Sequence, residues 1–486
     1  MDENSQTKKH LMQSALCYRE QRQDHWSSLA RRMDTWTSRG VYYHRRITEI
    51  YHYLISPDQR IIEIGCGKGD LLASLKPSVG VGIDFSEEMI TRAKQKYPDL
   101  RFVQCDAHEI DLDEKFDVII LSDLLNDLWD VQRVFQQIQK LCTPQTRIIL
   151  NLYSQVWELP LKCAQHLQLT TPLLPQNWLT VEDITNMLHL AGFEVIRFWP
   201  EILWPLNTPI ISTFFNKYLV KIWPFLFFAL TNFMIARLRP TKRWIKKKPR
   251  VSVIIPARNE SGNIEEIFAR TPEMGGGTEL IFVEGNSEDN TYETVEKAIK
   301  NHPERNCKLF RQTGIGKGDA VRLGYQNASG EILMILDADM TVPPEDLPRF
   351  YDAICSGEGE FINGVRLVYP MEQQAMRYLN LLGNKFFSLS FSWLFGQPVK
   401  DTLCGTKVLS RENYEVLAQN RSYFGEFDPF GDFDLLFGAV KMNMKIVEMP
   451  IRYAERKYGN TNIDRWRHGW LLLKMTFFAM KRIKFI

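Results

Sequence analysis

The chain has 486 residues, 44% of them hydrophobic and 24% charged, and this composition excludes a disordered or fibrous protein. Because the length exceeds that of one ordinary hydrophobic core, we expect two or three domains. The net charge of +2 gives no global reason to expect a nucleic-acid partner.

The cellular compartment is indicated by the N-terminus and the cysteines. The first residues, MDENSQTKKHLMQ, contain no apolar run typical of a signal peptide. The eight cysteines lack CxxC pairs and metal-ligand spacing, which suits free thiols in a reducing compartment. We therefore expect a cytoplasmic protein.

A strand, a glycine-rich turn and a helix are predicted from residue 60 onward, in RIIEIGCGKGDLLASL. Gly65, Gly67 and Gly69 fall where a buried parallel strand turns tightly and lets a ligand approach the backbone. The next apolar segment, VGVGID, ends at Asp84, about 20 residues after the turn, where a carboxylate commonly binds ribose hydroxyls.

Two further strands are predicted to end in carboxylates, RFVQCD at Asp106 and FDVIILSD at Asp123. Helical segments alternate with these strands. This alternation predicts an α/β fold with a doubly wound sheet, in which ligands bind at the carboxyl edge of the strands.

The segment EIGCGKG, residues 63–69, resembles motif I of the class I S-adenosylmethionine-dependent methyltransferases, and the resemblance covers most of residues 40–240. It implies S-adenosylmethionine as the cofactor. The glycine turn and its preceding acid would flank the methionine moiety, and the next two acids would bind the ribose and the adenine amine. The residues to which we assign cofactor binding are Glu63, Gly65, Gly67, Gly69, Asp84, Asp106 and Asp123.

The methyl acceptor is not identified by the sequence. A general base matters only if the acceptor is a weakly acidic hydroxyl or amine. Candidates near the expected mouth of the site are Asp123, Asn126, Asp127 and Tyr153, and none is preferred. The aromatic and basic cluster at residues 42–46 is expected to cover the cofactor. An inactive Rossmann-like domain is the alternative.

The end of this first domain is predicted to be a hairpin, with strand FEVIRF, a helix through Phe225 and strand NFMIARL. It contains an uncharged run of 15 residues, 222–236. Since a membrane-spanning helix needs about 20 apolar residues, we expect a buried helix followed by a strand instead.

A basic linker is predicted at residues 241–250, where six of ten residues are Lys or Arg. The alternation of strands and helices restarts at Val251. The strand EILMILDAD ends with Asp337 and Asp339, and residues two apart in a strand face the same side. Two carboxylates on one face predict a divalent cation with oxygen ligands, Mg²⁺ or Mn²⁺.

Four motifs follow one another in the second half: PARNE at 256–260, Glu284 with the polar turn 287–291, GKG at 316–318, and the DAD segment at 337–339. This half, residues 251–467, resembles the family 2 glycosyltransferases of the GT-A fold. Within that family it is most similar to the dolichol-phosphate mannosyltransferase branch and its bacterial relatives.

This second resemblance implies roles for individual residues. Lys317 would lie near the diphosphate, and Asp434, with Asp432 second, would be the base or would orient the acceptor. Arg456 and the loop 458–461 would clamp a phosphate. The residues assigned to the nucleotide-sugar are Pro256, Asn259, Glu260, Glu284, Lys317 and Asp337, and the metal ligands are Asp337 and Asp339.

The resemblance also implies inversion at the anomeric carbon. Transfer of a single sugar is favoured because the Gln-x-x-Arg-Trp signature of processive synthases is missing. For the aromatic segment 386–396, core packing and membrane contact stay open. The tail, residues 468–486, alternates bulky apolar residues with Lys and Arg, as an interfacial helix does.

The sequence thus predicts a bifunctional enzyme with two doubly wound domains, a Rossmann-like methyltransferase at 1–240 and a GT-A glycosyltransferase at 251–467. The expected partners are a nucleotide-sugar donor and a lipid-linked acceptor, a polyprenyl phosphate or a glycan, at the cytoplasmic membrane surface. The alternative is a glycosyltransferase whose first domain binds S-adenosylmethionine for regulation only. The oligomeric state stays open.

Overall fold

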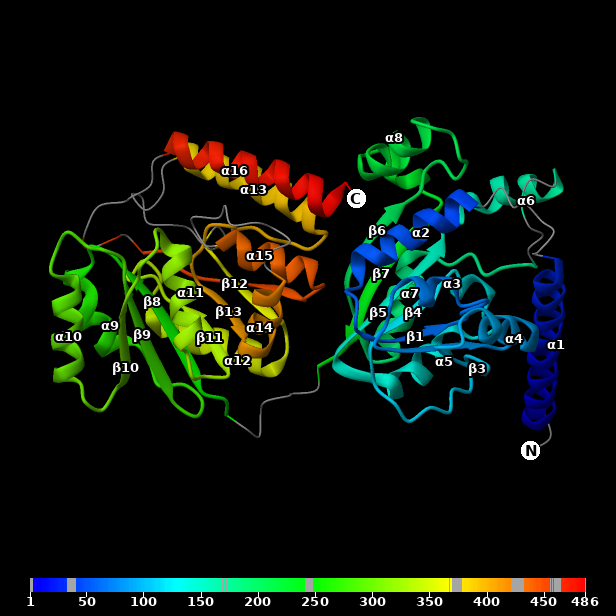
Figure 1. The fold of residues 1–486 in the computed structure, drawn as a ribbon, viewed down its shortest axis with the longest axis horizontal. Helices are drawn as coiled ribbons and strands as arrows, with labels where there is room; N and C mark the ends of the chain where they lie inside the picture. Colours follow the sequence, from blue (N-terminus) through cyan, green and yellow to red (C-terminus); the bar gives the residue numbers. More distant parts are fainter. Residues whose placement is uncertain are drawn as a thin grey trace. The chain divides into compact units, whose positions relative to one another are not determined.

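The computed structural model describes residues 3–32, 41–167, 170, 174–240, 248–366, 368, 378–420, 432–454, 456, 458 and 465–485. The chain divides into two compact units, Met1–Arg239 with Phe485–Ile486, and Pro240–Lys484 (Figure 1). Most of the predicted basic linker, residues 241–247, lies outside the described residues.

The first unit is built on a seven-stranded sheet with strand order β3-β2-β1-β4-β5-β7-β6. All neighbouring strands pair in parallel except β7, which is antiparallel to both β5 and β6. The strands are β1 (Arg60–Ile64), β2 (Val79–Asp84), β3 (Arg101–Gln104), β4 (Phe116–Ser122), β5 (Cys142–Tyr153), β6 (Phe193–Glu201) and β7 (Thr231–Leu238).

Helices cover both faces of this sheet, which explains why its strands read as continuous apolar runs. On one face Ile61 of β1 packs against α2, α3 and α4, and on the other Ile62 packs against α5 and α7. The helices of the unit are α1 (Glu3–Arg32), α2 (Val41–Leu54), α3 (Asp70–Ser74), α4 (Glu87–Lys96), α5 (Val131–Ile138), α6 (Glu158–His166), α7 (Val181–Leu190) and α8 (Ile211–Lys217).

The predicted final hairpin is confirmed, because β6 and β7 pair antiparallel. The prediction of a buried helix within the run 222–236 is wrong. A short 3-10 helix, Phe225–Phe228, stands there, and Trp223 is 73% exposed. Burial in this run begins at Ala229, two residues before β7, since apolar composition alone does not decide which residues face the core.

The second unit has its own seven-stranded sheet, with order β10-β9-β8-β11-β13-β12-β14. The doubly wound pattern is again confirmed, except that β13 runs antiparallel to β11 and β12. The strands are β8 (Val251–Ala257), β9 (Thr278–Glu284), β10 (Asn306–Arg311), β11 (Ile332–Ile335), β12 (Phe361–Val365), β13 (Lys407–Ser410) and β14 (Ile446–Pro450).

Two groups of helices sandwich the second sheet, α9, α10 and α12 on one face and α11, α13, α14, α15 and α16 on the other. Figure 1 shows α13 and α16 lying side by side. The helices are α9 (Ile264–Arg270), α10 (Thr291–Asn301), α11 (Lys317–Asn327), α12 (Leu347–Ser356), α13 (Tyr378–Phe395), α14 (Arg411–Gln419), α15 (Asp432–Lys441) and α16 (Arg465–Ala479).

The two segments considered for membrane contact are amphipathic in the folded unit. Phe391 of α13 and Met475 of α16 are buried in the core, whereas Leu389 and Trp470 are exposed. Among the described residues, no helix is both long and apolar enough to span a bilayer. All eight cysteines are free.

Candidate functional site

Glu63 is a buried acid in β1, directly before the glycine turn of the first unit. Its Oε2 accepts a hydrogen bond from the backbone N–H of Leu72 at 3.1 Å, and the residue is 3% exposed. Burial raises the pKa of Glu63 to about 8. A cationic ligand nearby would favour the ionised form, because an opposite charge offsets desolvation.

A hydrogen bond links the backbone of the glycine turn to the side chain of Asp84. Asp84 lies at the end of β2, and its carboxylate accepts hydrogen bonds from the N–H of Gly67 at 3.0 Å and of Ser86 at 2.9 Å. Gly69 has φ +76, and a Cβ there would lie 2.5 Å from the Phe102 ring. The turn therefore requires glycine, and Asp84 is fixed at the edge of the sheet.

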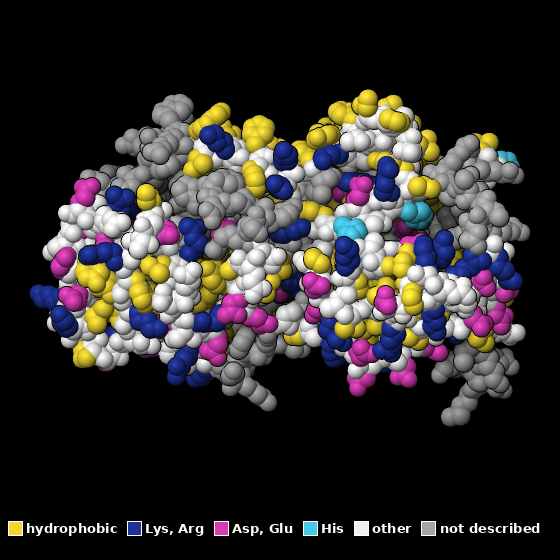
Figure 2. Space-filling model, in the orientation of Figure 1, with side chains coloured by type: hydrophobic (Ala, Val, Ile, Leu, Met, Phe, Trp, Pro, Cys, Tyr) yellow, Lys and Arg dark blue, Asp and Glu magenta, His cyan; other side chains and the backbone are white. Residues whose placement is uncertain are grey.

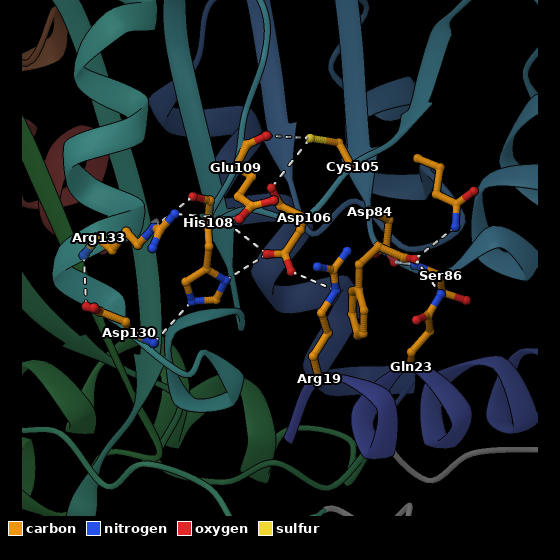
Figure 3. Close-up of polar contacts among 12 residues, drawn as sticks. Arg19, Gln23, Asp84, Ser86, Cys105, Asp106, His108, Glu109, Asp130 and Arg133 are labelled. Carbon is orange, nitrogen blue, oxygen red and sulfur yellow. Dashed lines mark hydrogen bonds and ion pairs between the residues drawn. The ribbon is translucent and has the colours of Figure 1, made fainter. Parts of the chain in front are cut away.

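The carboxylate of Asp106 contacts two side chains, one on each oxygen, as Figure 3 shows. One carboxylate oxygen lies 2.7 Å from Nδ1 of His108, and the other lies 3.0 Å from Nε of Arg19. Burial on its own raises the pKa of Asp106, but the bonds from His108 and the charge of Arg19 outweigh burial and leave the pKa below its ordinary value. Because β3 ends at Gln104, this acid lies in the following loop and not in the strand.

The helix α1 lies across this carboxyl edge, which the sequence did not predict. Arg22 and Trp26 donate hydrogen bonds to the two carboxylate oxygens of Asp127, at 2.8 and 2.7 Å. Gln23 donates to the carbonyl oxygen of Phe85 at 3.2 Å. Positions 19, 22, 23 and 26 share one helical face. Their spacing was therefore the signal in the sequence that could have predicted a polar contact surface on this helix.

Asp123 follows β4 with a positive φ of 51°. Tyr43 of α2 donates to its Oδ1 at 2.7 Å, and Asn151 of β5 donates to the same oxygen. Burial raises the pKa of Asp123 despite these bonds. Of the other base candidates, Asn126 is fully buried and bonded to backbone atoms, and burial raises the pKa of Tyr153.

In the second unit Arg456 joins two of the predicted acids. Its guanidinium lies 2.7 Å from Asp339 Oδ2 and 3.2 Å from Glu260 Oε1. Burial raises the pKa of Glu260 to about 7, although the charge of Arg456 acts against it. The charges of Asp337 and Asp339 also raise this pKa, so the three acids act on one another.

Asp337 is paired with Lys317, the first residue of α11, whose Nζ lies 2.6 Å from Oδ1. Burial alone raises the pKa of Asp337, but the charges of Lys317, Lys407 and Arg366 hold it below its ordinary value. A Cβ at position 405 would lie 2.0 Å from Asp337 Oδ2 and 2.3 Å from Lys317 Nζ, so a side chain there would displace the ends of both residues.

Two cations near Asp337, the buried Lys407 and the partly buried Arg366, were missed in the sequence analysis. Lys407 is fully buried and donates to the carbonyl oxygen of Cys404. Arg366 binds both carboxylate oxygens of the buried Asp401, at 2.7 and 2.9 Å. No sequence pattern marked these residues, because a charged side chain is normally expected on the surface.

The predicted nucleoside residues meet at the ends of β8 and β9. Glu284 is 2% exposed, accepts from the N–H of Ser287, and lies 3.3 Å from the guanidinium of Arg311. Asn259 has a positive φ of 57°, and its N–H donates to Ser287 Oγ at 3.0 Å. Pro256 is the penultimate residue of β8.

The acceptor-side predictions are described in part. Asp434 of α15 is buried, at 8% exposure. The side chain of Asp432 and residues 459–461 of the predicted phosphate clamp lie outside the described residues. Tyr458 contacts Ser261 Oγ through its hydroxyl at 3.1 Å.

The strand-alternation argument for the metal site is wrong, because β11 ends at Ile335, before Asp337. The two acids nevertheless remain accessible, with side-chain exposures of 26% for Asp337 and 16% for Asp339. Within the described part of the chain, no three His, Cys, Asp or Glu residues form a metal site on their own. Two carboxylates fit Mg²⁺ or Mn²⁺ if other oxygens, such as those of a diphosphate, complete the coordination.

Comparison with known families assigns both units. Residues 55–192 match the family model of a methyltransferase domain, and residues 252–416 match that of glycosyl transferase family 2. The chain joins a methyltransferase domain to a family 2 glycosyltransferase domain. The fold classes predicted for the two halves, Rossmann-like and GT-A, are therefore confirmed.

The glycosyltransferase domain is similar to polyprenyl-phosphate sugar transferases. A dolichol-phosphate mannosyltransferase of Pyrococcus furiosus is 28% identical over 236 residues, covering 46% of this chain and 64% of that protein. An undecaprenyl-phosphate 4-deoxy-4-formamido-L-arabinose transferase of Proteus mirabilis is 24% identical over 222 residues, covering 44% and 63%. This chain thus spans less than two thirds of the length of these two relatives.

Solved structures resemble each domain at low identity. Glucosyl-3-phosphoglycerate synthase from Mycobacterium tuberculosis, with Mn²⁺ and uridine diphosphate, gives a TM-score of 0.37 at 18% identity, covering 50% of this chain and 82% of that chain. A methyltransferase from Clostridium acetobutylicum gives 0.28 at 15% identity, covering 41% and 90%.

Proposed function

We propose that the glycosyltransferase domain transfers one sugar from a nucleotide-sugar to a polyprenyl phosphate, with inversion at the anomeric carbon. The observation that carries the proposal is the meeting of Glu260, Asp337 and Asp339 with Lys317 and Arg456. Acids alternating with mobile cationic side chains suit a substrate that carries a diphosphate and a metal ion. The relatives are named for dolichol phosphate and undecaprenyl phosphate.

On the donor side, Pro256, Asn259 and Glu284 hold the nucleoside, and Lys317 binds the diphosphate. Asp337 and Asp339 would hold Mg²⁺ or Mn²⁺, which neutralises charge on the departing diphosphate. For this binding the two acids must exchange their present cation partners for the metal.

On the acceptor side, a phosphate oxygen forms the new bond to the anomeric carbon while the bond from that carbon to the nucleoside diphosphate breaks. A lipid phosphate is already ionised near neutral pH, so this step needs no strong base. Asp434 orients the acceptor, with Asp432 as the second candidate. Arg456, which pairs with Glu260 and Asp339 in the structure, would pair with the acceptor phosphate.

The methyltransferase domain binds S-adenosylmethionine in this proposal, through the turn at residues 65–69, Glu63, Asp84 and Asp106. Asp123, presented by Tyr43, lies at the same sheet edge and faces the methyl acceptor. Because methyl transfer is an in-line displacement, positioning of the two reactants supplies most of the catalysis. We place both reactions in the synthesis of one glycolipid.

The donor site is tested by calorimetric titration of a panel of nucleotide-sugars with and without Mn²⁺, with wild type and Asp339→Ala. We expect one donor to bind roughly tenfold more tightly with Mn²⁺, and the metal effect to vanish in Asp339→Ala. Asp346→Ala, which removes an acid paired to Arg349 outside the site, is the matched control and should behave as wild type. Absence of a metal effect in wild type contradicts the proposal.

The methyltransferase activity is tested with methyl-labelled cofactor and lipid products taken before and after glycosylation. Label in either lipid supports two active domains. Cofactor binding without label in any lipid fraction favours the alternative, a domain that binds S-adenosylmethionine for regulation only.

A further inference from the structure

The connection between β6 and β7, residues 202–230, exposes an unusual amount of apolar surface; we call this segment the cap. Ile210 is 83% and Trp223 73% exposed, and Phe214, Phe227 and Phe228 are each more than half exposed. Figure 2 shows hydrophobic side chains gathered over α8, the helix of the cap. Contiguous apolar patches of this kind mark sites of protein or membrane contact.

The helix α8 buries two polar side chains and exposes an aromatic one. Ser212 and Asn216 are buried, at 3% and 1% exposure, whereas Phe214 is exposed. The Asn216 side chain accepts from the N–H of Leu203 at 2.8 Å and of Trp204 at 2.7 Å, and it donates to the hydroxyl of Tyr42 at 3.0 Å. These bonds fix the polar face inward, so the apolar side chains are held on the outside and cannot fold back onto the domain.

The charge of the cap distinguishes between possible partners. The sequence contains no Asp or Glu from residue 202 to residue 230, and its two charged residues are Lys217 and Lys221. Lys221 is neutralised by the buried Glu201, which leaves Lys217 as a half-buried positive charge beside exposed aromatic rings. An acid-free surface with aromatic side chains and a basic residue suits the headgroup region of an anionic bilayer.

The glycosyltransferase domain carries a surface of the same chemistry. On α13 and α16, the exposed Leu389, Trp470 and Phe477 stand among basic residues, and no acid occurs in residues 378–395 or 465–486. Recurrence of acid-free apolar surface in two separately folded domains favours a shared environment, because a protein partner specific to one domain would not require it in the other.

We propose that the cap docks the methyltransferase domain onto an anionic lipid bilayer, with the aromatic side chains of the cap inserted at the headgroup level. The docking rests on the proposed function, in that a lipid-linked acceptor is reached from the bilayer surface. The connection between β7 and the edge strand β6 thereby forms a membrane contact of the methyltransferase domain.

The test is sedimentation of the full chain with vesicles of phosphatidylcholine, alone or mixed with phosphatidylglycerol. We expect wild type to bind the mixed vesicles, and Trp223→Ser/Phe227→Ser/Phe228→Ser to bind them roughly tenfold more weakly. The matched control is Leu190→Ser/Phe198→Ser, which removes two exposed apolar side chains of the same domain outside the cap and should bind as wild type. Thermal melting confirms that the variants are folded.

Equal vesicle binding by wild type and the cap variant overturns the docking. If the cap variant then also differs from wild type in oligomeric state, measured by light scattering without lipid, the cap is identified as a contact between copies of the chain. Trp470→Ser/Phe477→Ser provides the parallel measurement for the glycosyltransferase domain.

The proposed transferase function is tested separately, with a short-chain polyprenyl phosphate in detergent. Because this acceptor needs no bilayer, the cap variant should retain wild-type transfer of sugar to it. Failure of wild type in this assay contradicts the glycosyltransferase proposal, while the vesicle result still decides the docking.

Discussion

The two domains hold the acids at their sheet edges in different ways. In the methyltransferase domain, the carboxylates of Glu63 and Asp84 accept hydrogen bonds only from backbone N–H groups among the contacts described above, those of α3, of the glycine turn and of the loop after β2. In the glycosyltransferase domain, Asp337 and Asp339 each pair with a side-chain cation, Lys317 or Arg456, and one oxygen of Asp339 also accepts from the N–H and the hydroxyl of Thr341. Backbone donors stay in place when a ligand binds, whereas long cationic side chains can change partner.

The difference indicates how each site accepts its ligand. The first site is pre-organised by its backbone, and its acids serve the fold as well as the ligand. The second pairs two of its acids with side-chain cations, which under the proposed function would give way to a metal and a diphosphate. The following predictions, from the largest expected effect to the smallest, test this comparison.

Replacement of Arg456 by Gln tests the exchange of partners most directly. We expect sugar transfer to fall about 100-fold, a loss on the order of 3 kcal/mol in transition-state stabilisation. At the same time Mn²⁺ should bind the free protein more tightly, because Asp339 and Glu260 no longer have a competing cation. Initial rates and titration of Mn²⁺ by electron paramagnetic resonance measure the two effects.

The control for this variant is Arg270→Gln, which removes an arginine paired to Glu266 and Glu345 elsewhere in the same domain. It should change neither quantity. Weaker Mn²⁺ binding by Arg456→Gln would show that the arginine supports the metal site and does not compete with it.

Asp84→Asn should destabilise the methyltransferase domain by about 1–3 kcal/mol, because an amide N–H₂ then faces a backbone N–H donor of Gly67 or Ser86. Asp339→Asn should cost less than about 1 kcal/mol, since the amide oxygen can still accept from the N–H of Thr341 and only a partly exposed ion pair is lost. Hydrogen exchange of peptides from β1, β2 and β11, measured by mass spectrometry, reports each domain. Equal losses of stability in Asp84→Asn and Asp339→Asn would contradict the proposed difference between the two sheet edges.

The stability of the methyltransferase domain should fall as pH rises from about 5 to about 8. The folded domain raises the pKa of Glu63 from 4.5 to about 8, so in this window it keeps a proton that the unfolded chain has released. Raising the pH therefore favours the unfolded chain, by up to about 1.4 kcal/mol per pH unit for one group. The side chain in Glu63→Gln stays neutral, so this variant should lose the part of the pH dependence of stability that comes from Glu63. Urea unfolding at several pH values, followed by hydrogen exchange of β1 peptides, measures the change.

Arg19→Ala should have the smallest effect, a gain of a few-fold in affinity for S-adenosylmethionine. The arginine pairs with Asp106, the acid assigned to the adenine amine, and this exposed pair is worth about 0.2–1 kcal/mol. Calorimetry on the full chain measures the change, with Arg31→Ala on the same helix as the control. A loss of affinity instead would make Arg19 part of the cofactor site.

The strands and the acids that follow them were predictable, since strands buried on both faces leave apolar runs and end where polar residues begin. The contribution of α1 was not, because the polar face of Arg19, Arg22 and Gln23 gains meaning only when the helix is seen to cross the sheet edge. The burial of Lys407 was not predicted for a related reason, because no sequence pattern indicates that a charged side chain lies inside the protein.

The error at residues 222–228 has the opposite origin. Apolar residues there were assigned to the core by default, yet Trp223 and its neighbours face outward. Asn216 is buried in this segment instead, and it accepts hydrogen bonds from the backbone of residues 203 and 204. These bonds could not be inferred from the presence of an asparagine in the sequence.

Gly405 leaves room for the ends of the Lys317 and Asp337 side chains. A Cβ at this position would lie 2.0 Å from Asp337 Oδ2 and 2.3 Å from Lys317 Nζ, so both side chains would have to shift. Under the proposed function, efforts to redirect the domain to new sugars should leave this position unaltered and vary the surrounding loops, because a methyl group here would displace a metal ligand and the lysine assigned to the diphosphate.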